Sequence, residues 1–193
     1  MKEHFQAKDI QKIVNIPKHR YEYLGSKIGI KPDVTEVEGQ GHAHLYSLKN
    51  LLQFAFVHKA NSLGLTPNAA RRMLIFLDWL ERTQKFGIYD LNKQVRISLH
   101  YIHMAFEFFA ASVLENTGSS SRFFLDGQWI EQMKLVFSQA GEEFSSLTEL
   151  LDRIQKIGGI EQLLFDAFGY VTINVGHVKF VTLERLREAG ERT

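Results

Sequence analysis

Two short amphipathic stretches separated by a proline-containing break constrain the fold of this chain more than any other feature. Apolar residues recur at helical spacing in residues 7–14 and again in residues 17–28. They are Ile10, Ile13 and Val14 in the first stretch, and Tyr21, Leu24 and Ile28 in the second. Pro17 suits the first turn of a new helix, because the N–H that proline lacks is not needed there. The pattern predicts a helix-turn-helix.

The segment that follows predicts a β-hairpin and two more helices. Apolar residues within 33–46 flank a glycine-rich tip at 39–41, as in a hairpin. Ser47 is a good helix N-cap, and Thr66 is a cap followed by proline at the first helical position. The order helix, helix, hairpin, helix, helix predicts a winged helix-turn-helix over residues 1–77.

Three segments of this region resemble the DNA-binding domain of MerR-type transcriptional regulators. They are NIPKHRYEYLGSKIGIKP (15–32), HLYS (44–47) and LGLTPNAARRML (63–74), which occur in the family's order within residues 5–74. The resemblance implies a recognition helix in the major groove of double-stranded DNA, a wing beside it, and a homodimer on two half-sites. Effectors in the family include metals and hydrophobic small molecules. No cofactor is expected, and the effector of this chain stays unknown at this point.

Nine side chains on the second helix and around the wing are the candidate DNA contacts. They are Lys18, His19, Arg20, Glu22, Tyr23, Lys27, Lys31, His42 and His44. Their donors and aromatic rings suit phosphates and base edges, and an ordinary solvated helix face is the alternative. Glu22 stands where the family commonly has arginine, and it either accepts a hydrogen bond from cytosine or pairs with Lys18. Glu36 and Glu38 add negative charge near the wing, so tight binding by one copy is not expected.

The C-terminal half carries no DNA-binding pattern. Residues 94–115 are dense in apolar and aromatic residues, and we predict one long helix that is buried on several sides. Its aromatic residues would line a dimer core or an effector pocket, and they are Tyr101, Phe106, Phe108 and Phe109. On such a helix His100, His103 and Glu107 share a face, a spacing that can hold a divalent metal. Histidines satisfied by their neighbours are the alternative.

The rest of the C-terminal half is expected to be mainly helical. Helices are predicted at 129–140, 147–157 and 160–168, with a last helix that ends near Ala189. Strands are predicted at 123–125 and 170–175, and they could pair as a small two-stranded sheet. We therefore expect a mainly α protein in three parts: the winged helix-turn-helix (1–77), a connecting segment (78–95), and a helical dimerisation or effector domain (96–193).

Composition narrows the class of protein. None of the 193 residues is cysteine, which excludes disulfides, thiolate metal sites and a cysteine nucleophile. No signal sequence or apolar run long enough to span a membrane is present, so a cytoplasmic protein is expected. Residues 1–82 hold 12 basic against 8 acidic residues, whereas residues 83–193 hold 11 against 14. The N-terminal part is therefore the half that suits a polyanion.

These patterns favour a sequence-specific DNA-binding transcriptional regulator that acts as a homodimer and is not an enzyme. The partners would be double-stranded DNA, a second copy of the chain, and an apolar small molecule if the aromatic segment forms a pocket. The alternative is an adaptor that uses the winged helix to dock a protein or organise DNA without regulating a promoter. A metal-dependent enzyme built on His100, His103 and Glu107 is a third, weaker hypothesis.

Overall fold

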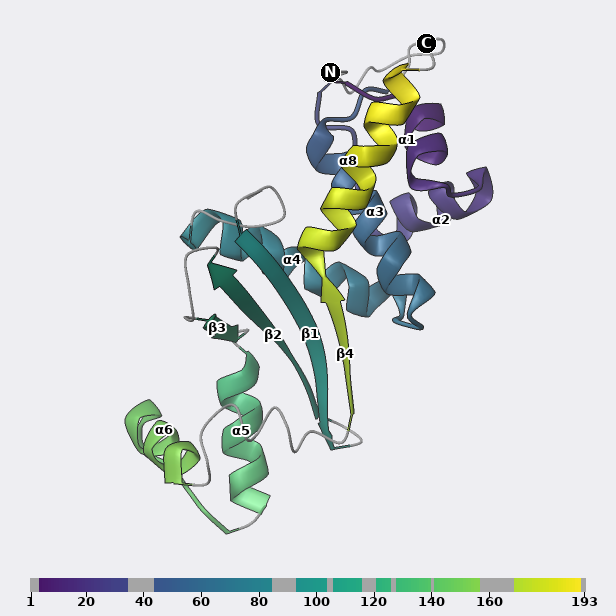
Figure 1. Ribbon diagram of the computed structural model, residues 1–193. Helices are drawn as coiled ribbons and strands as arrows, with labels where there is room; N and C mark the ends of the chain where they lie inside the picture. Colours follow the sequence, from purple (N-terminus) through teal and green to yellow (C-terminus); the bar gives the residue numbers. More distant parts are fainter. Residues whose placement is uncertain are drawn as a thin grey trace.

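The computed structural model is mainly helical, with a four-stranded antiparallel sheet beneath a cluster of N-terminal helices (Figure 1). It describes residues 4–34, 44–84, 93–103, 106–115, 121–125, 128–139, 141–156 and 169–191. Seven helices and four strands lie within these residues. None of the described helices is both long and apolar enough to cross a membrane.

The first two helices form the predicted pair. Helix α1 (Ala7–Val14) begins with a capping box in which the backbone N–H of Gln6 donates to Asp9 at 2.7 Å. It ends at Asn15, whose φ of 60° is the left-handed conformation that asparagine tolerates at a helix end. Helix α2 (Lys18–Ile28) begins after Pro17 and ends at Gly29, where φ is 82°. The prediction of two helices with a break after residue 14 is confirmed, although α2 begins one residue later than predicted because Pro17 is its N-cap.

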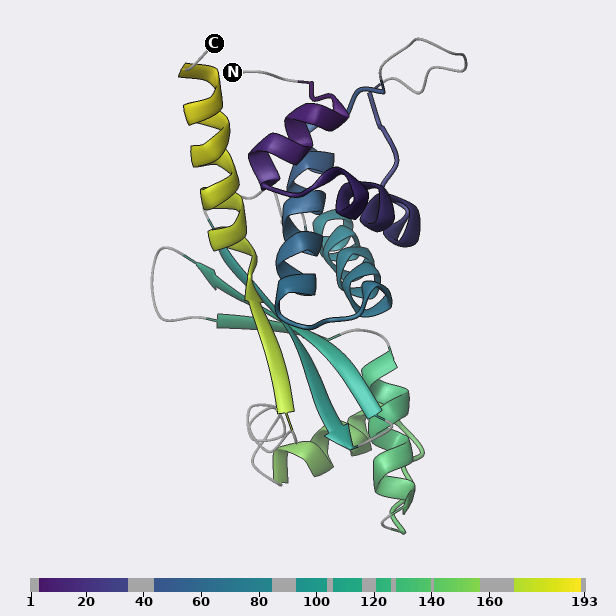
Figure 2. The same cartoon turned by 90° about the vertical axis from the view of Figure 1, so that its right-hand side faces the viewer.

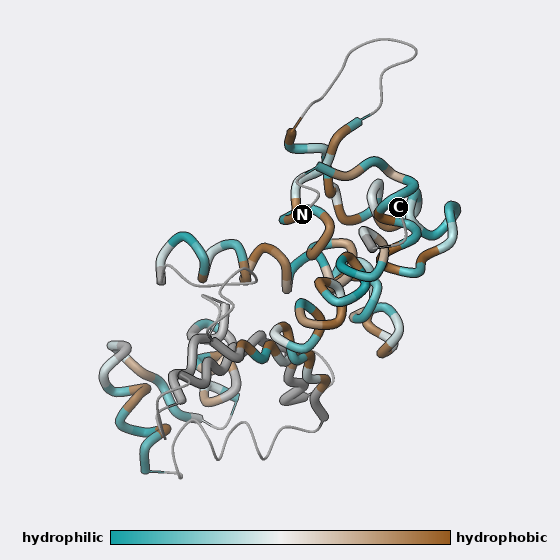
Figure 3. Tube along the Cα trace, turned by 45° about the horizontal axis from the view of Figure 1, so that its top comes forward, coloured by the Kyte–Doolittle hydropathy of each residue, from teal (hydrophilic) through white to brown (hydrophobic). Residues whose placement is uncertain are grey.

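Helices α3 (Leu48–Ser62) and α4 (Pro67–Gln84) complete the N-terminal cluster. Both predicted caps are present: Ser47 accepts a hydrogen bond from the N–H of Asn50 at 3.4 Å, and Thr66 accepts one from Ala69 at 3.2 Å. Helix α3 is buried on most of its sides, because α1, α2, α4 and the last helix of the chain all pack against it. Hydrophobic and hydrophilic stretches follow one another along the helical part of the chain (Figure 3). This is expected of helices that turn one face toward the core.

The long helix predicted at 94–115 is wrong, because this segment is a β-hairpin. Strand β1 (Lys93–His103) pairs antiparallel with strand β2 (Phe106–Glu115). Alternate residues Val95, Ile97 and Leu99 are buried, whereas Arg96 between them is exposed. That period of two is the signature of a half-buried strand, and the high density of aromatic residues after it obscured the alternation.

The two short strands were predicted correctly, but their pairing was not. Strand β3 (Ser121–Leu125) pairs with β2, and strand β4 (Gly169–Asn174) pairs with β1, so the sheet order is β3-β2-β1-β4. The two strands therefore lie at opposite edges of one sheet (Figure 1). The predicted two-stranded sheet lacks β1 and β2, the two central strands, because the prediction makes that segment a helix.

The remaining helices agree with the pattern of the sequence. Helix α5 (Gln128–Gln139) and helix α6 (Leu147–Lys156) confirm two predicted helices, while the helix predicted at 160–168 lies outside the described residues. Helix α8 (Val175–Glu191) follows β4 directly and runs back along α1 and α3 (Figures 1 and 2). The last helix of the chain is thus part of the N-terminal cluster.

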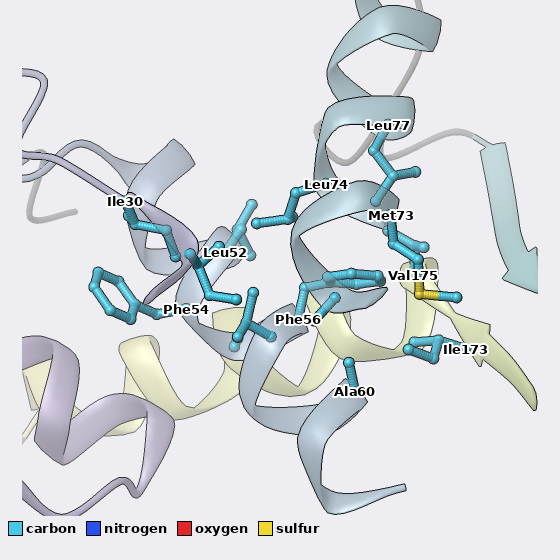
Figure 4. Close-up of a cluster of buried hydrophobic side chains, with 14 of the residues drawn as sticks. Ile30, Leu52, Phe54, Phe56, Ala60, Met73, Leu74, Leu77, Ile173 and Val175 are labelled. Carbon is cyan, nitrogen blue, oxygen red and sulfur yellow. The ribbon is translucent and has the colours of Figure 1, made fainter. Parts of the chain in front are cut away.

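One hydrophobic cluster links the N-terminal helices to the sheet. Side chains from α3 and α4 converge on Ile173 of β4 and Val175 at the start of α8 (Figure 4). The cluster continues through alternate residues of β1 to Leu186 of α8. The division into parts at 77 and 96 stays a prediction, but the buried side chains run across it without a break.

Candidate nucleic-acid interface

Helix α2 is anchored along one side, as its apolar spacing predicted. Leu24 is fully buried and Ile28 is 6% exposed. The ring of Tyr21 stacks on Phe54 of α3 with centroids 4.9 Å apart, and its hydroxyl lies 2.6 Å from the hydroxyl of Tyr46. Burying side chains of this size contributes about 1.5–3 kcal/mol each. The orientation of α2 about its own axis is therefore fixed.

The surroundings of Tyr21 disfavour its ionisation. Burial raises the pKa of Tyr21 well above its ordinary value of 10, and the hydrogen bond with Tyr46 raises it further. The hydroxyl pair joins α2 to Tyr46, two residues before the start of α3, and Tyr46 is itself buried, with 7% of its surface exposed.

The opposite side of α2 is open to solvent. Lys18, His19, Glu22, Tyr23 and Lys27 are all exposed, and Tyr23 keeps 44% of its surface accessible. Helix α8 covers α1 and α3 and does not pack on α2, which lies at the edge of the cluster (Figure 2). Five of the nine predicted contacts therefore lie on one free helical face, although nothing in the structure shows what they bind.

Glu22 is one of these five, and its geometry agrees with one of its two predicted roles. A carboxylate oxygen of Glu22 lies 3.8 Å from the ammonium nitrogen of Lys18, one helical turn earlier. Both side chains are largely exposed, so the pair contributes little to stability and is readily exchanged for another partner. Base recognition by Glu22 remains a prediction.

Arg20 differs from its neighbours because it is held by α3. Its Nη2 donates to Oδ1 of Asn61 at 2.6 Å, and Nδ2 of Asn61 donates to the carbonyl of Leu65 at 3.1 Å. The side chain is half-buried and joins the first turn of α2 to the last turn of α3. No local pattern indicates this link, because its partners are 41 positions apart. Arg20 positions the helix, and its role as a DNA contact stays a prediction.

The base of the expected wing is closed, although most of the wing lies outside the described residues. Asp33 accepts hydrogen bonds from the backbone N–H and the hydroxyl of Ser47, and the N–H of Val34 donates to the carbonyl of Leu45 at 3.3 Å. The described flanks form no strand pair with each other; Tyr46 instead forms an isolated bridge with Phe5. The hairpin tip and His42 fall within the undescribed residues 35–43.

Two more candidates lie at the ends of this loop. Lys31 precedes it and His44 follows it, and both are exposed. Lys31 follows the end of α2 by three residues, and the bonds between Asp33 and Ser47 bring the two ends of the loop together.

The C-terminal candidates lose the helical spacing on which they rested. His100, Tyr101 and His103 lie in β1, and Glu107 lies in β2, where the backbone register pairs it with Tyr101 and not with either histidine. Among the described residues no group of three histidines or carboxylates could hold a metal. Phe106, Phe108 and Phe109 also lie in β2, and the side chains of all seven C-terminal candidates fall outside the described part, so the structure does not test the metal and pocket hypotheses.

Sequence reasoning missed a basic cleft on the other side of the cluster. It lies between α8 and the helices α1 and α3, and its charged lining residues are Lys59 and Arg185. These residues are 126 positions apart in a chain whose last helix was not expected to return to the first, so no local pattern could have revealed the cleft.

Comparisons with known proteins add no family to this description. No protein-family model matches the chain, and no curated protein is significantly similar to it. The class that the geometry defines is a helix-turn-helix pair, with a free second helix, built onto an antiparallel sheet.

Proposed function

We propose that this chain is a sequence-specific DNA-binding transcriptional regulator of the MerR type, which acts as a homodimer and places α2 in the major groove. One observation carries the proposal: the second helix of a helix-turn-helix pair is anchored through Leu24 and Ile28 and presents Tyr23 and Lys27 to solvent. The resemblance of residues 15–32, described above, adds to this support.

The size and chemistry of the free face suit a major groove. An α-helix with its side chains is about 10–12 Å across, and the groove is about 12 Å wide. Tyr23 and His19 would offer hydrogen-bonding and apolar groups to base edges, and Lys18, Lys27 and Lys31 would contact phosphates. All five of these side chains are exposed. The wing of the proposed winged helix would be formed by the loop whose base Asp33 and Ser47 close.

The charge of the face supports a homodimer. Glu22 offsets one of the lysines on the helix, so a single copy offers few unopposed phosphate contacts. Two copies on half-sites about one helical turn apart add their contacts and their base recognition. We therefore propose that the C-terminal part dimerises the chain, senses an effector, or does both.

The adaptor remains the second candidate because of Glu22 itself. Its side chain is 59% exposed and lies beside the exposed ring of Tyr23, a pairing that would also suit a basic protein surface. A protein adaptor would bind no preferred DNA sequence at low salt, whereas a regulator would bind one with an affinity that falls steeply as salt rises. These outcomes separate the two classes.

Selection of bound duplexes from a random pool tests the proposal. The full chain should enrich an inverted repeat, and the double variant Tyr23→Ala/Lys27→Gln should enrich none. Arg20 is left intact, since its bond to Asn61 would confuse a binding defect with a folding defect. Recovery of no preferred sequence by the wild-type chain would overturn the proposal.

A further inference from the structure

A cleft of about 260 Å³ lies between α8 and the ends of α1 and α3. Its walls are built from three helices, and the residues that line it include Val14 of α1, His58 and Lys59 of α3, and Val178, Val181 and Arg185 of α8. The volume is slightly below the range of about 300–1,000 Å³ that is usual for small-molecule sites. A ligand of a few heavy atoms would fit.

The charge inside the cleft is positive. Lys59 and Arg185 stand on opposite walls, and none of the described lining residues is acidic. A neighbouring hollow shares Arg185, and its other charged lining residues are Lys12 and Glu188. Lys59 has no ion-pair partner among the described residues. The cleft therefore has two cations and no internal anion to balance them.

Arg185 is held in place for this role. Its Nη1 lies 3.3 Å from the carbonyl oxygen of Val14 in the last turn of α1, where helix carbonyls have no partner within the helix. The same nitrogen also lies 3.5 Å from the carbonyl oxygen of Ile13, so both contacts are made through Nη1. They leave the N–H donors of Nε and Nη2 available for a ligand.

His58 is a second sign that a partner is missing from the wall. Its Nδ1 is buried and has no hydrogen-bond partner among the described residues. Burial lowers the pKa of His58, and the positive charges of Arg20 and Arg185 lower it further. The positive charges of both arginines therefore act on the imidazole, and an anion in the cleft would offset them.

The other side of the cleft is apolar. Val14 and Ala55 face it from the N-terminal helices, and Val178 and Val181 face it from α8. These apolar side chains make no favourable contact with an inorganic ion. They can pack against a short hydrocarbon chain, and this burial contributes about 25 cal/mol of binding free energy per Å² of apolar surface removed from water. The cationic side and the apolar side of the cleft together suit a ligand with a charged end and a hydrocarbon end.

We propose that this cleft binds a small organic carboxylate, with the carboxylate between Lys59 and Arg185 and its short hydrocarbon part against Val178 and Val181. The cleft adjoins the anchor of the recognition helix, because Ser62 in its wall is the chain neighbour of Asn61, which holds Arg20. A ligand in the cleft and helix α2 would both contact the last turn of α3. If the proposed regulatory function holds, the cleft could therefore serve as its effector site.

The test measures binding to the full chain in the absence of DNA, so that its outcome is independent of the proposed function. Calorimetric titration with hexanoate should give saturable one-site binding, and the His58 signals in a spectrum of ¹³C-labelled histidine should shift over the same concentrations. Hexanamide, which keeps the hydrocarbon and loses the charge, should bind at least about tenfold more weakly, because hydrogen bonds to charged groups are the stronger ones. Inorganic phosphate, which keeps charge and loses the hydrocarbon, should also bind more weakly than hexanoate.

Two lysine variants separate the site from general attraction to a basic protein. Lys59→Gln should weaken hexanoate binding by about tenfold, whereas Lys156→Gln, an exposed lysine of α6, should leave it unchanged. Both side chains are exposed, so neither change should unfold the chain, and an unchanged melting temperature checks this. Equal binding of hexanoate and hexanamide, tighter binding of phosphate, no binding of hexanoate, or equal effects of the two lysine changes would each overturn the proposal.

Discussion

The guanidinium of Arg20 lies 2.6 Å from the side-chain oxygen of Asn61, and this bond joins the first turn of α2 to the last turn of α3. Asn61 in turn donates to the carbonyl of Leu65 at 3.1 Å, so one amide serves both the helix-turn-helix pair and the turn before α4. The position of the free helix therefore depends on a residue outside the pair.

Loss of this amide should destabilise the chain. Asn61→Ala removes a hydrogen bond to a charged group at a half-buried position, so we expect the free energy of unfolding to fall by about 1–2 kcal/mol. Urea unfolding followed by circular dichroism measures it. Ser62→Ala is the matched control, since within the described residues that hydroxyl donates to the carbonyl of Lys59 in its own helix, and its loss should cost less than about 0.5 kcal/mol. Equal costs would show that the Arg20 link carries no stability.

The tyrosine pair makes a similar prediction with the ring left in place. Tyr21→Phe keeps the stacking on Phe54 but leaves the Tyr46 hydroxyl without this partner, so stability should fall by about 1 kcal/mol. Tyr23→Phe removes a hydroxyl from the exposed face of the same helix and should change stability by less than about 0.5 kcal/mol. Chemical denaturation of both variants compares them, and a reversed order would contradict the anchored orientation of α2.

His58 should make stability depend on pH. The unfolded chain binds a proton at this residue near the ordinary pKa of 6.5, whereas the folded chain binds it only at lower pH, because burial and then Arg20 and Arg185 disfavour the charged form. Stability should therefore fall as pH drops below 6.5, until the lowered pKa of the folded state is passed. The variant His58→Gln should lose this part of the pH dependence. Unfolding measured from pH 8 to pH 5 tests it, with pH 8 as the reference, and an identical slope in both proteins would contradict it.

The β-hairpin that replaces the predicted long helix gives an alternating mutational pattern. Ile97 is fully buried, so Ile97→Ala should cost about 2–5 kcal/mol, whereas Arg96→Ala at the neighbouring exposed position should cost less than about 0.5 kcal/mol. Thermal or urea unfolding of the two variants distinguishes them. Comparable losses at both positions would contradict the strand assignment.

The local features of the N-terminal helices could be predicted from the sequence because their signals are local. Ser47 and Thr66 begin helices through hydrogen bonds within a few residues, and both caps were predicted correctly. The exposed side of α2 followed from the same helical period that buried Leu24 and Ile28.

The hairpin and the cleft could not be predicted in the same way. Alternation from Val95 to Leu99 covers only five residues, and the aromatic-rich stretch that follows is equally typical of a buried helix. The strands at 121–125 and 169–174 each pair with one strand of this hairpin and not with each other. A prediction that makes the hairpin a helix therefore also loses the partners of both edge strands. The return of α8 to α1 is a long-range contact, so the positions of Arg185 and His58 relative to each other had no signal in the sequence.

The effect of Lys27, one of the two exposed lysines of α2, on the salt dependence of DNA binding tests the central claim most directly. The dissociation constant of the full chain for its selected duplex is measured between 50 mM and 200 mM salt for wild type, Lys27→Gln and the control Lys156→Gln. If Lys27 contacts a phosphate, its variant should bind more weakly and its slope of log affinity against log salt should be smaller by about 1, with the control unchanged. A Lys27→Gln protein that binds the duplex with the affinity and slope of wild type would show that this face of α2 does not meet DNA.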